Sequence, residues 1–124
     1  MPIKPTDSEL EILTLIWQKN KATVREIHEA LSANKDTGYT TTLKLMQIMH
    51  GKGLLGRDEE QRTHVYYAAI DKTDTQKTLV DDFVSAAFGG SAKNLVMQAL
   101  GQGNPSKEEI DEIRALLDKL QKEQ

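Results

Sequence analysis

Cysteine is absent from this chain of 124 residues. That absence excludes disulfide bridges, thiolate metal sites and cysteine nucleophiles. No apolar run approaches the roughly 18–20 residues that a membrane-spanning helix needs. The opening residues MPIKPTDSE also lack the apolar core of a signal peptide. We therefore expect a cytoplasmic protein that does not insert into a membrane.

Catalytic patterns are missing as well. We find no spacing of nucleophile and base, no phosphate-binding loop and no paired-carboxylate motif. The three histidines, at positions 28, 50 and 64, fall on different predicted elements without the spacing of metal ligands. We therefore expect no metal and no other cofactor, and an enzyme is the class that we expect least.

Acidic residues are absent from residues 37–57 (TGYTTTLKLMQIMHGKGLLGR), although the whole chain has a net charge of −3. Lys44, Lys52 and Arg57 give this segment a local charge of +3. Residues 1–72 are neutral overall, and residues 73–124 carry the net negative charge. A neutral module with one basic face can bind DNA, because phosphates respond to the local field.

Helical signals recur along the first half of the chain. Thr6 with Glu9, and Thr23 with Glu26, have the spacing of capping boxes, which begin helices. A third helix is predicted over residues 39–52, with Gly53 as its C-terminal cap. Residues 54–57 and 63–68 are predicted strands around a polar turn. Three helices and a hairpin in about 70 residues are typical of a winged helix-turn-helix.

Three further helices are expected beyond the polar segment 71–74, which looks like a junction: 75–88, 91–100, and a last helix that begins with a capping box at Ser106 and Glu109. The predicted fold class is mainly α with a small β-hairpin wing. The predicted domains are a winged helix-turn-helix at 1–72 and a helical dimerisation region at 73–124.

The predicted tail is too short to close a good core alone. Sharing its apolar faces with a second copy is the economical solution, since two-fold dimers are the commonest soluble oligomers. The residues that we assign to this dimer interface are Leu79, Val80, Phe83, Val84, Phe88, Leu95, Ile113 and Leu117.

The predicted helix 39–52 has a core face and a free face at 100° per residue. Thr40, Lys44 and Gln47 share the free face, where they can reach base edges in the major groove. Thr41 is a candidate for base or phosphate contact. Tyr39 either donates its hydroxyl to a phosphate or packs over the turn. Leu43 either touches a thymine methyl group or packs in the core.

The predicted hairpin carries Arg57, Arg62 and His64. We assign these three residues to phosphate contact, with Arg62 as the strongest candidate. The alternative is a solvated hairpin whose charged edges prevent aggregation.

The chain resembles the penicillinase-repressor family along essentially its whole length. The segments that carry the resemblance are DSELEIL at 7–13, IW at 16–17, GYTTT at 38–42, KGLL at 52–55 and RTHVY at 62–66. The resemblance implies a homodimeric repressor that occupies a partly palindromic operator. It also implies release by a membrane sensor metalloprotease that cleaves the helical tail. The cleaved Asn-Phe bond of the family aligns with Gln98-Ala99. Copper-responsive members bear C-terminal cysteines, which this chain lacks, so we do not expect copper sensing.

Two alternative functions stay open at this point. One is a winged helix that binds proteins and never touches DNA, which the acidic total charge permits. The other is a regulator whose small effector lies between helices of the tail.

Overall fold

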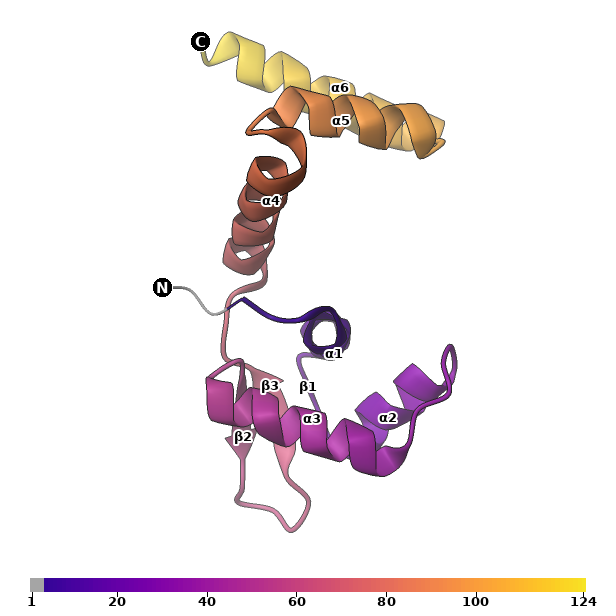
Figure 1. Ribbon diagram of the computed structural model, residues 1–124, viewed down its shortest axis with the longest axis vertical. Helices are drawn as coiled ribbons and strands as arrows, with labels where there is room; N and C mark the ends of the chain where they lie inside the picture. The colour runs from indigo at the N-terminus through magenta and orange to yellow at the C-terminus, as the bar shows by residue number, and fades with distance from the viewer. Residues whose placement is uncertain (1–3) are drawn as a thin grey trace. The chain divides into compact units, whose positions relative to one another are not determined.

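The computed structural model describes residues 4–124, and in that part of the chain it has six helices and three short strands (Figure 1). The elements are α1 (Asp7–Lys19), β1 (Lys21–Ala22), α2 (Val24–Ser32), α3 (Tyr39–Lys52), β2 (Leu55–Asp58), β3 (Val65–Ala68), α4 (Lys72–Phe88), α5 (Ala92–Gln102) and α6 (Lys107–Lys122).

The chain divides into two compact units, one ending at Leu79 and the other running from Val80 to Gln124. Helix α4 begins in the first unit and ends in the second. The sequence predicts the domain boundary after Lys72, where α4 begins.

All three predicted capping boxes are confirmed. In α1 the backbone N–H of Glu9 donates to Thr6 Oγ1 (3.2 Å), and the backbone N–H of Thr6 donates to Glu9 Oε1 (2.9 Å). The same reciprocal pair begins α2 at Thr23 and α6 at Ser106. Each box supplies partners for backbone donors that the first turn of a helix leaves unpaired.

The predicted end of α3 is confirmed at Gly53. Its φ of 85° is left-handed, a conformation that costs glycine little. Its N–H donates to the carbonyl of His50 (3.1 Å), and the N–H of Leu54 donates to the carbonyl of Met49 (3.0 Å). The chain therefore turns sharply from α3 into β2.

The strands form an antiparallel sheet in the order β1-β3-β2. The pairing of Gly56 with Tyr67 puts a glycine under the tyrosine ring, where a Cβ would clash with the ring. The sequence did not predict β1, whose two residues are too few to show a period. In Figure 1 the loop that joins β2 and β3 projects away from α1, α2 and α3.

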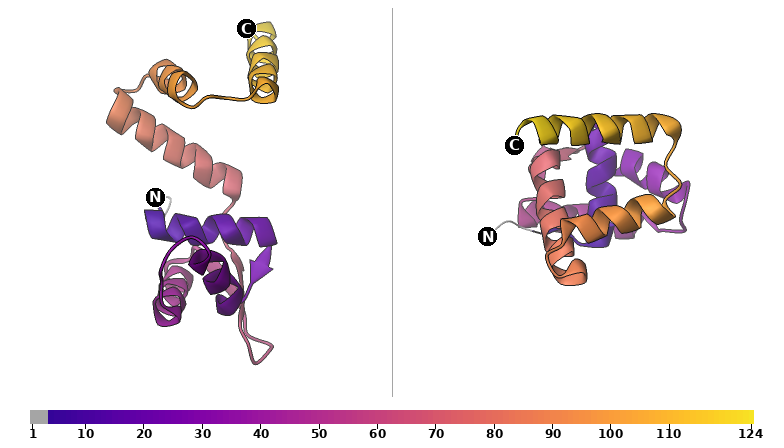
Figure 2. Two further views of the ribbon diagram at one scale, coloured as in Figure 1. Left: turned by 90° about the vertical axis from the view of Figure 1, so that its right-hand side faces the viewer. Right: turned by 90° about the horizontal axis from the view of Figure 1, so that it is seen from above.

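The core of the first unit lies between α1, α2, α3 and the sheet. In the left view of Figure 2, α1 lies on one side of α2 and α3, and the hairpin projects on the other side. The buried core side chains are Ile12, Leu13, Ile16, Ala22, Val24, Ile27, Met46, Met49, Leu54, Leu55 and Tyr66. Trp17 is half-buried and packs against this core, and its Nε1 donates to the carbonyl of Ile70 (3.3 Å).

The predicted junction at residues 71–74 is wrong, because α4 already begins at Lys72. The backbone N–H of Asp74 donates to the Asp71 carboxylate (3.0 Å), and Thr75 Oγ1 donates to the Asp71 carbonyl (2.7 Å). The polar residues that suggested a loop therefore form the cap and first turn of a helix.

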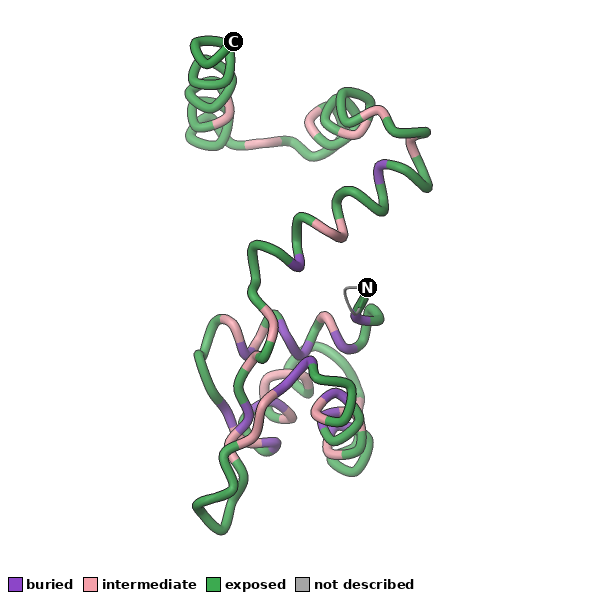
Figure 3. Tube along the Cα trace, turned by 90° about the vertical axis from the view of Figure 1, so that its left-hand side faces the viewer, coloured by how far each residue is buried: buried purple, intermediate pink, exposed green. Residues whose placement is uncertain are grey.

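The second unit buries little of its apolar surface. Helices α5 and α6 have no buried residue, and Figure 3 shows them without a buried segment. Of the predicted interface residues, Val84 is buried; Leu79, Phe88, Leu95 and Ile113 are half-buried; and Val80, Phe83 and Leu117 are exposed. Further exposed apolar side chains are Val96, Met97, Ile110, Leu116 and Leu120.

Within residues 4–124, no helix combines the length and the apolar character that crossing a bilayer requires.

Candidate nucleic-acid interface

Helix α3 presents the two faces that the sequence predicts. Thr42, Met46 and Met49 are buried in the core. On the opposite side Thr40, Lys44 and Gln47 are exposed. These three residues, at i, i+4 and i+7, form one stripe that we call the free face of α3. Its side chains supply a hydroxyl, an ammonium and an amide, all of which can bond to base edges.

Two further residues, Ile48 and Gly51, lie beside the free face, and the sequence pattern did not indicate them. Ile48 is 49% exposed, although its residue type suggested burial. A Cβ on Gly51 would meet nothing within 4 Å. Gly51 therefore leaves room for close approach, and Ile48 offers an apolar contact beside Lys44. Helical spacing from the buried Met46 and Met49 was the signal that could have found both.

The start of α3 is held by His28 of α2. Its Nδ1 lies 3.3 Å from Thr42 Oγ1, and its Nε2 lies 3.3 Å from Ser32 Oγ. The edge of the Tyr39 ring meets the His28 ring, with 5.5 Å between the centroids. His28 therefore positions the first turn of α3, a role that spacing along one element could not reveal.

The flanking predicted residues differ in exposure. Tyr39 is 44% exposed, and Thr41 is exposed beside it. Leu43 is half-buried and packs against the core while it also lines a surface hollow. The structure therefore shows the core packing of Leu43, and its contact with a thymine methyl group stays a prediction.

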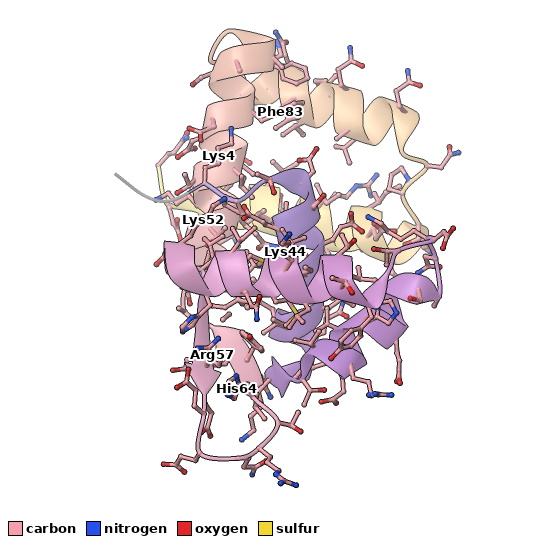
Figure 4. All side chains as sticks on the ribbon, turned by 60° about the horizontal axis from the view of Figure 1, so that its bottom comes forward. Lys4, Lys44, Lys52, Arg57, His64 and Phe83 are labelled. Carbon is pink, nitrogen blue, oxygen red and sulfur yellow. The ribbon has the colours of Figure 1, made fainter. Side chains whose placement is uncertain are left out.

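The hairpin places its three predicted basic residues unequally. Figure 4 shows Arg57 and His64 on the hairpin and Lys44 and Lys52 along α3. Arg62 and His64 are exposed near the turn. Asp58 at the end of β2 and Glu59 and Glu60 in the turn lie beside them, so positive charge does not dominate the hairpin tip.

Arg57 is engaged within the hairpin. Its Nε donates to Glu59 Oε1 (2.7 Å), its Nη2 forms an ion pair with the same oxygen, and its guanidinium lies 5.9 Å from the centroid of the Tyr66 ring. Hydrogen bonding to Tyr66 and to Glu59 raises the pKa of Arg57, and Arg57 lowers the pKa of Glu59. The charge of Arg57 is thus largely offset by its neighbour.

A hollow of about 270 Å³ lies between α2, α3 and the hairpin. Tyr39, Leu43 and Gln47 line it from α3 at intervals of four residues. The other lining residues are Val24, Arg25, Thr63, His64 and Tyr66. The hollow therefore brings together four residues that the sequence predicts to contact DNA, from α3 and the hairpin, and adds Arg25 of α2, which the sequence did not indicate.

No group of three or more histidine or acidic side chains that could hold a metal ion occurs in the part of the chain that the structure describes.

The family model described as penicillinase repressor matches residues 5–119. The methicillin resistance regulatory protein MecI of Staphylococcus aureus is 25% identical over 114 residues, which are 92% of this chain and 93% of that protein. The penicillinase repressor of Bacillus licheniformis is 26% identical over 91% of this chain and 88% of its own length. The transcriptional regulator BlaI of Mycobacterium tuberculosis is 28% identical over 93% of this chain and 83% of its own length.

Two solved structures resemble the first part of the chain. The solution structure of the DNA-binding domain of the repressor BlaI aligns with a TM-score of 0.50 and 28% identity, covering 58% of this chain and 93% of that one. Monomeric Bacillus licheniformis BlaI in complex with the blaP half-operator aligns with a TM-score of 0.51 and 28% identity. The alignment covers 58% of this chain and 88% of that one. The likeness confirms the predicted winged helix-turn-helix fold.

Proposed function

Because the chain belongs to the penicillinase repressor family, we propose that it is a transcriptional repressor that binds a palindromic operator as a homodimer in the cytoplasm of a bacterium. The observation that carries this proposal is the free face of α3. Thr40, Lys44 and Gln47 project from it into solvent, opposite a face that is fully packed. The surrounding segment, 37–57, has no acidic residue to repel phosphate.

In this proposal α3 enters the major groove, which is wide enough for a helix. Lys44 and Gln47 reach base edges, with Thr40 and Thr41 at the N-terminal end, where recognition helices meet DNA. Arg62 and His64 of the hairpin contact flanking phosphates. The buried Met46 and Met49 hold α3 against the core, so that its orientation is set before DNA arrives.

The second unit joins two copies of the chain. Its support is the exposure of large apolar side chains such as Phe83 (55% exposed) and Leu117 (57%) in a unit that buries few of its own. Pairing these faces removes them from water. Two linked α3 helices then meet two half-sites together, which raises their effective concentration on the operator.

Regulated release is the remaining part of the proposal, and family resemblance supports it. A membrane sensor metalloprotease would cleave α5 at Gln98-Ala99, and both residues are exposed. Separating α6 from the rest of the second unit removes part of the apolar surface that pairs two copies. Co-expression with such a protease, followed by mass spectrometry of the fragments, tests this step; an intact chain under full induction contradicts it.

The experiment that tests the function is selection of duplexes from a random-sequence pool by the full-length protein. We expect an enriched sequence with two-fold symmetry, because a two-fold dimer presents α3 twice. Recovery of a pool without enrichment would refute operator recognition and favour a winged helix that binds proteins.

A further inference from the structure

We propose that Arg25 of α2 binds a backbone phosphate of the DNA at the hollow between α2, α3 and the hairpin. The inference rests on the proposed function, because it concerns how the same surface grips DNA. This contact lies on α2, whereas the sequence predicts phosphate contacts at Arg57, Arg62 and His64 of the hairpin.

The position of Arg25 is the first argument. It lines the hollow together with Tyr39 and Gln47 of α3 and with Thr63 and His64 of the hairpin. A DNA strand that lies along the free face of α3 and continues toward the hairpin passes over this hollow. Side chains from three elements therefore converge on the strand where it leaves α3.

The charge of the hollow is the second argument. Among the described residues that line it, Arg25 is the one permanent cation, and no carboxylate is present. Tyr39 and Thr63 add hydroxyl groups, and His64 adds a ring nitrogen. These groups can donate to phosphate oxygens, and a guanidinium can do so with two parallel N–H groups.

The availability of Arg25 is the third argument. It is exposed, and no acidic side chain forms an ion pair with it among residues 4–124. The carboxylate of its neighbour Glu26 accepts a hydrogen bond from the backbone N–H of Thr23 (3.0 Å). Arg57, in contrast, is paired with Glu59. Of these two arginines, Arg25 is the one free to meet a phosphate.

The test uses the full-length protein and a duplex that it selects from a random pool, with a scrambled duplex for comparison. Arg25→Gln should weaken binding to both duplexes by about tenfold, since a charge-assisted hydrogen bond is lost without any loss of base reading. The slope of log affinity against log salt should become shallower by about 0.9. Arg25→Lys should keep the wild-type slope. The control is the double substitution Arg57→Gln with Glu59→Gln, which removes an arginine together with its paired acid and leaves the net charge unchanged; it should change affinity less than about twofold.

A series of duplexes with one methylphosphonate each then locates the contact. Neutralising one particular phosphate should weaken the wild-type protein but leave the Arg25→Gln variant nearly unaffected. If Arg25→Gln binds like the wild type with an unchanged slope, or if each methylphosphonate affects both proteins equally, the assignment of Arg25 is wrong while operator binding stands. If the wild type shows neither sequence preference nor salt dependence, the proposed function fails first and Arg25 with it.

Discussion

The carboxylate of Glu9 and the ammonium of Lys52 lie 2.8 Å apart and join the first turn of α1 to the last turn of α3. Glu9 is 1% exposed, whereas the Lys52 side chain is 43% exposed. The same carboxylate accepts the N–H of Thr6 at the cap of α1. One buried acid therefore begins one helix and anchors the end of the helix that carries the proposed DNA-contacting face.

Removing this acid should destabilise the fold. Glu9→Ala should cost about 2 kcal/mol, from the lost cap and the lost charge-assisted hydrogen bond. Its matched control is Glu11→Ala, which breaks the exposed pair between Glu11 and Lys35 (3.2 Å) and should cost less than about 1 kcal/mol. Urea unfolding monitored by circular dichroism measures both; equal costs would show that the buried pair has no special role.

The stability that Glu9 contributes should depend on pH. Burial raises the pKa of Glu9, but Lys52 and the Thr6 backbone N–H lower it by more, so the pKa falls below its ordinary value of 4.5. A group with a lowered folded pKa stabilises the protein above its unfolded pKa and loses that contribution as pH falls through the folded pKa. The difference in unfolding free energy between wild type and Glu9→Gln should therefore be constant from pH 6 to pH 8 and shrink below about pH 4.5. A difference independent of pH would contradict the assignment.

The sequence predicts one partner of Glu9, the cap residue Thr6, but not the other, Lys52. The capping boxes were visible at Thr6, Thr23 and Ser106, because both members of a box stand three residues apart. The free face of α3 was visible through helical spacing. The contact of Glu9 with Lys52 was not visible, since 43 residues separate them and neither residue type indicates a tertiary partner.

The hairpin shows a second limit of the sequence. Its arginines predicted a basic wing, but whether Glu59 offsets the charge of Arg57 depends on the side-chain geometry at the end of β2. The hollow beside it was equally hidden, because Arg25, Gln47 and His64 belong to three elements and only the packed fold brings them together.

Breaking the pair within the hairpin should strengthen binding to DNA of any sequence. Glu59→Gln removes one negative charge and frees the Arg57 guanidinium for phosphate. We expect severalfold tighter binding to a scrambled duplex at low salt. The slope of log affinity against log salt should steepen by about 0.9 if only the repulsion between Glu59 and phosphate is lost, and by about 1.8 if Arg57 also gains a phosphate contact. The double substitution Glu59→Gln with Arg57→Gln should reverse most of this gain. Fluorescence anisotropy at several salt concentrations measures it, and an unchanged affinity for Glu59→Gln would show that the hairpin lies away from the DNA.

Pairing of two copies should depend on the exposed apolar residues of α6. Leu117→Asp places a charge in the proposed interface and should convert a dimer into a monomer, because burying an unpaired carboxylate is unfavourable. Ala115→Asp is the control, since Ala115 is also exposed but lies on the opposite side of the same helix. Sedimentation velocity distinguishes the species. A dimer that tolerates both changes would place the interface elsewhere.

Recognition by α3 is tested most directly by Lys44→Ala, titrated in parallel with Arg62→Ala against the selected operator and a scrambled duplex. Lys44→Ala should lose roughly 1–3 kcal/mol on the operator and lose preference at one base pair, while it binds the scrambled duplex almost like the wild type. Arg62→Ala should weaken binding to both duplexes alike and lower the salt slope by about one ion. If Lys44→Ala weakens both duplexes equally, Lys44 contacts phosphate and reads no base. If neither substitution alters binding, α3 and the hairpin are not the surface that meets DNA.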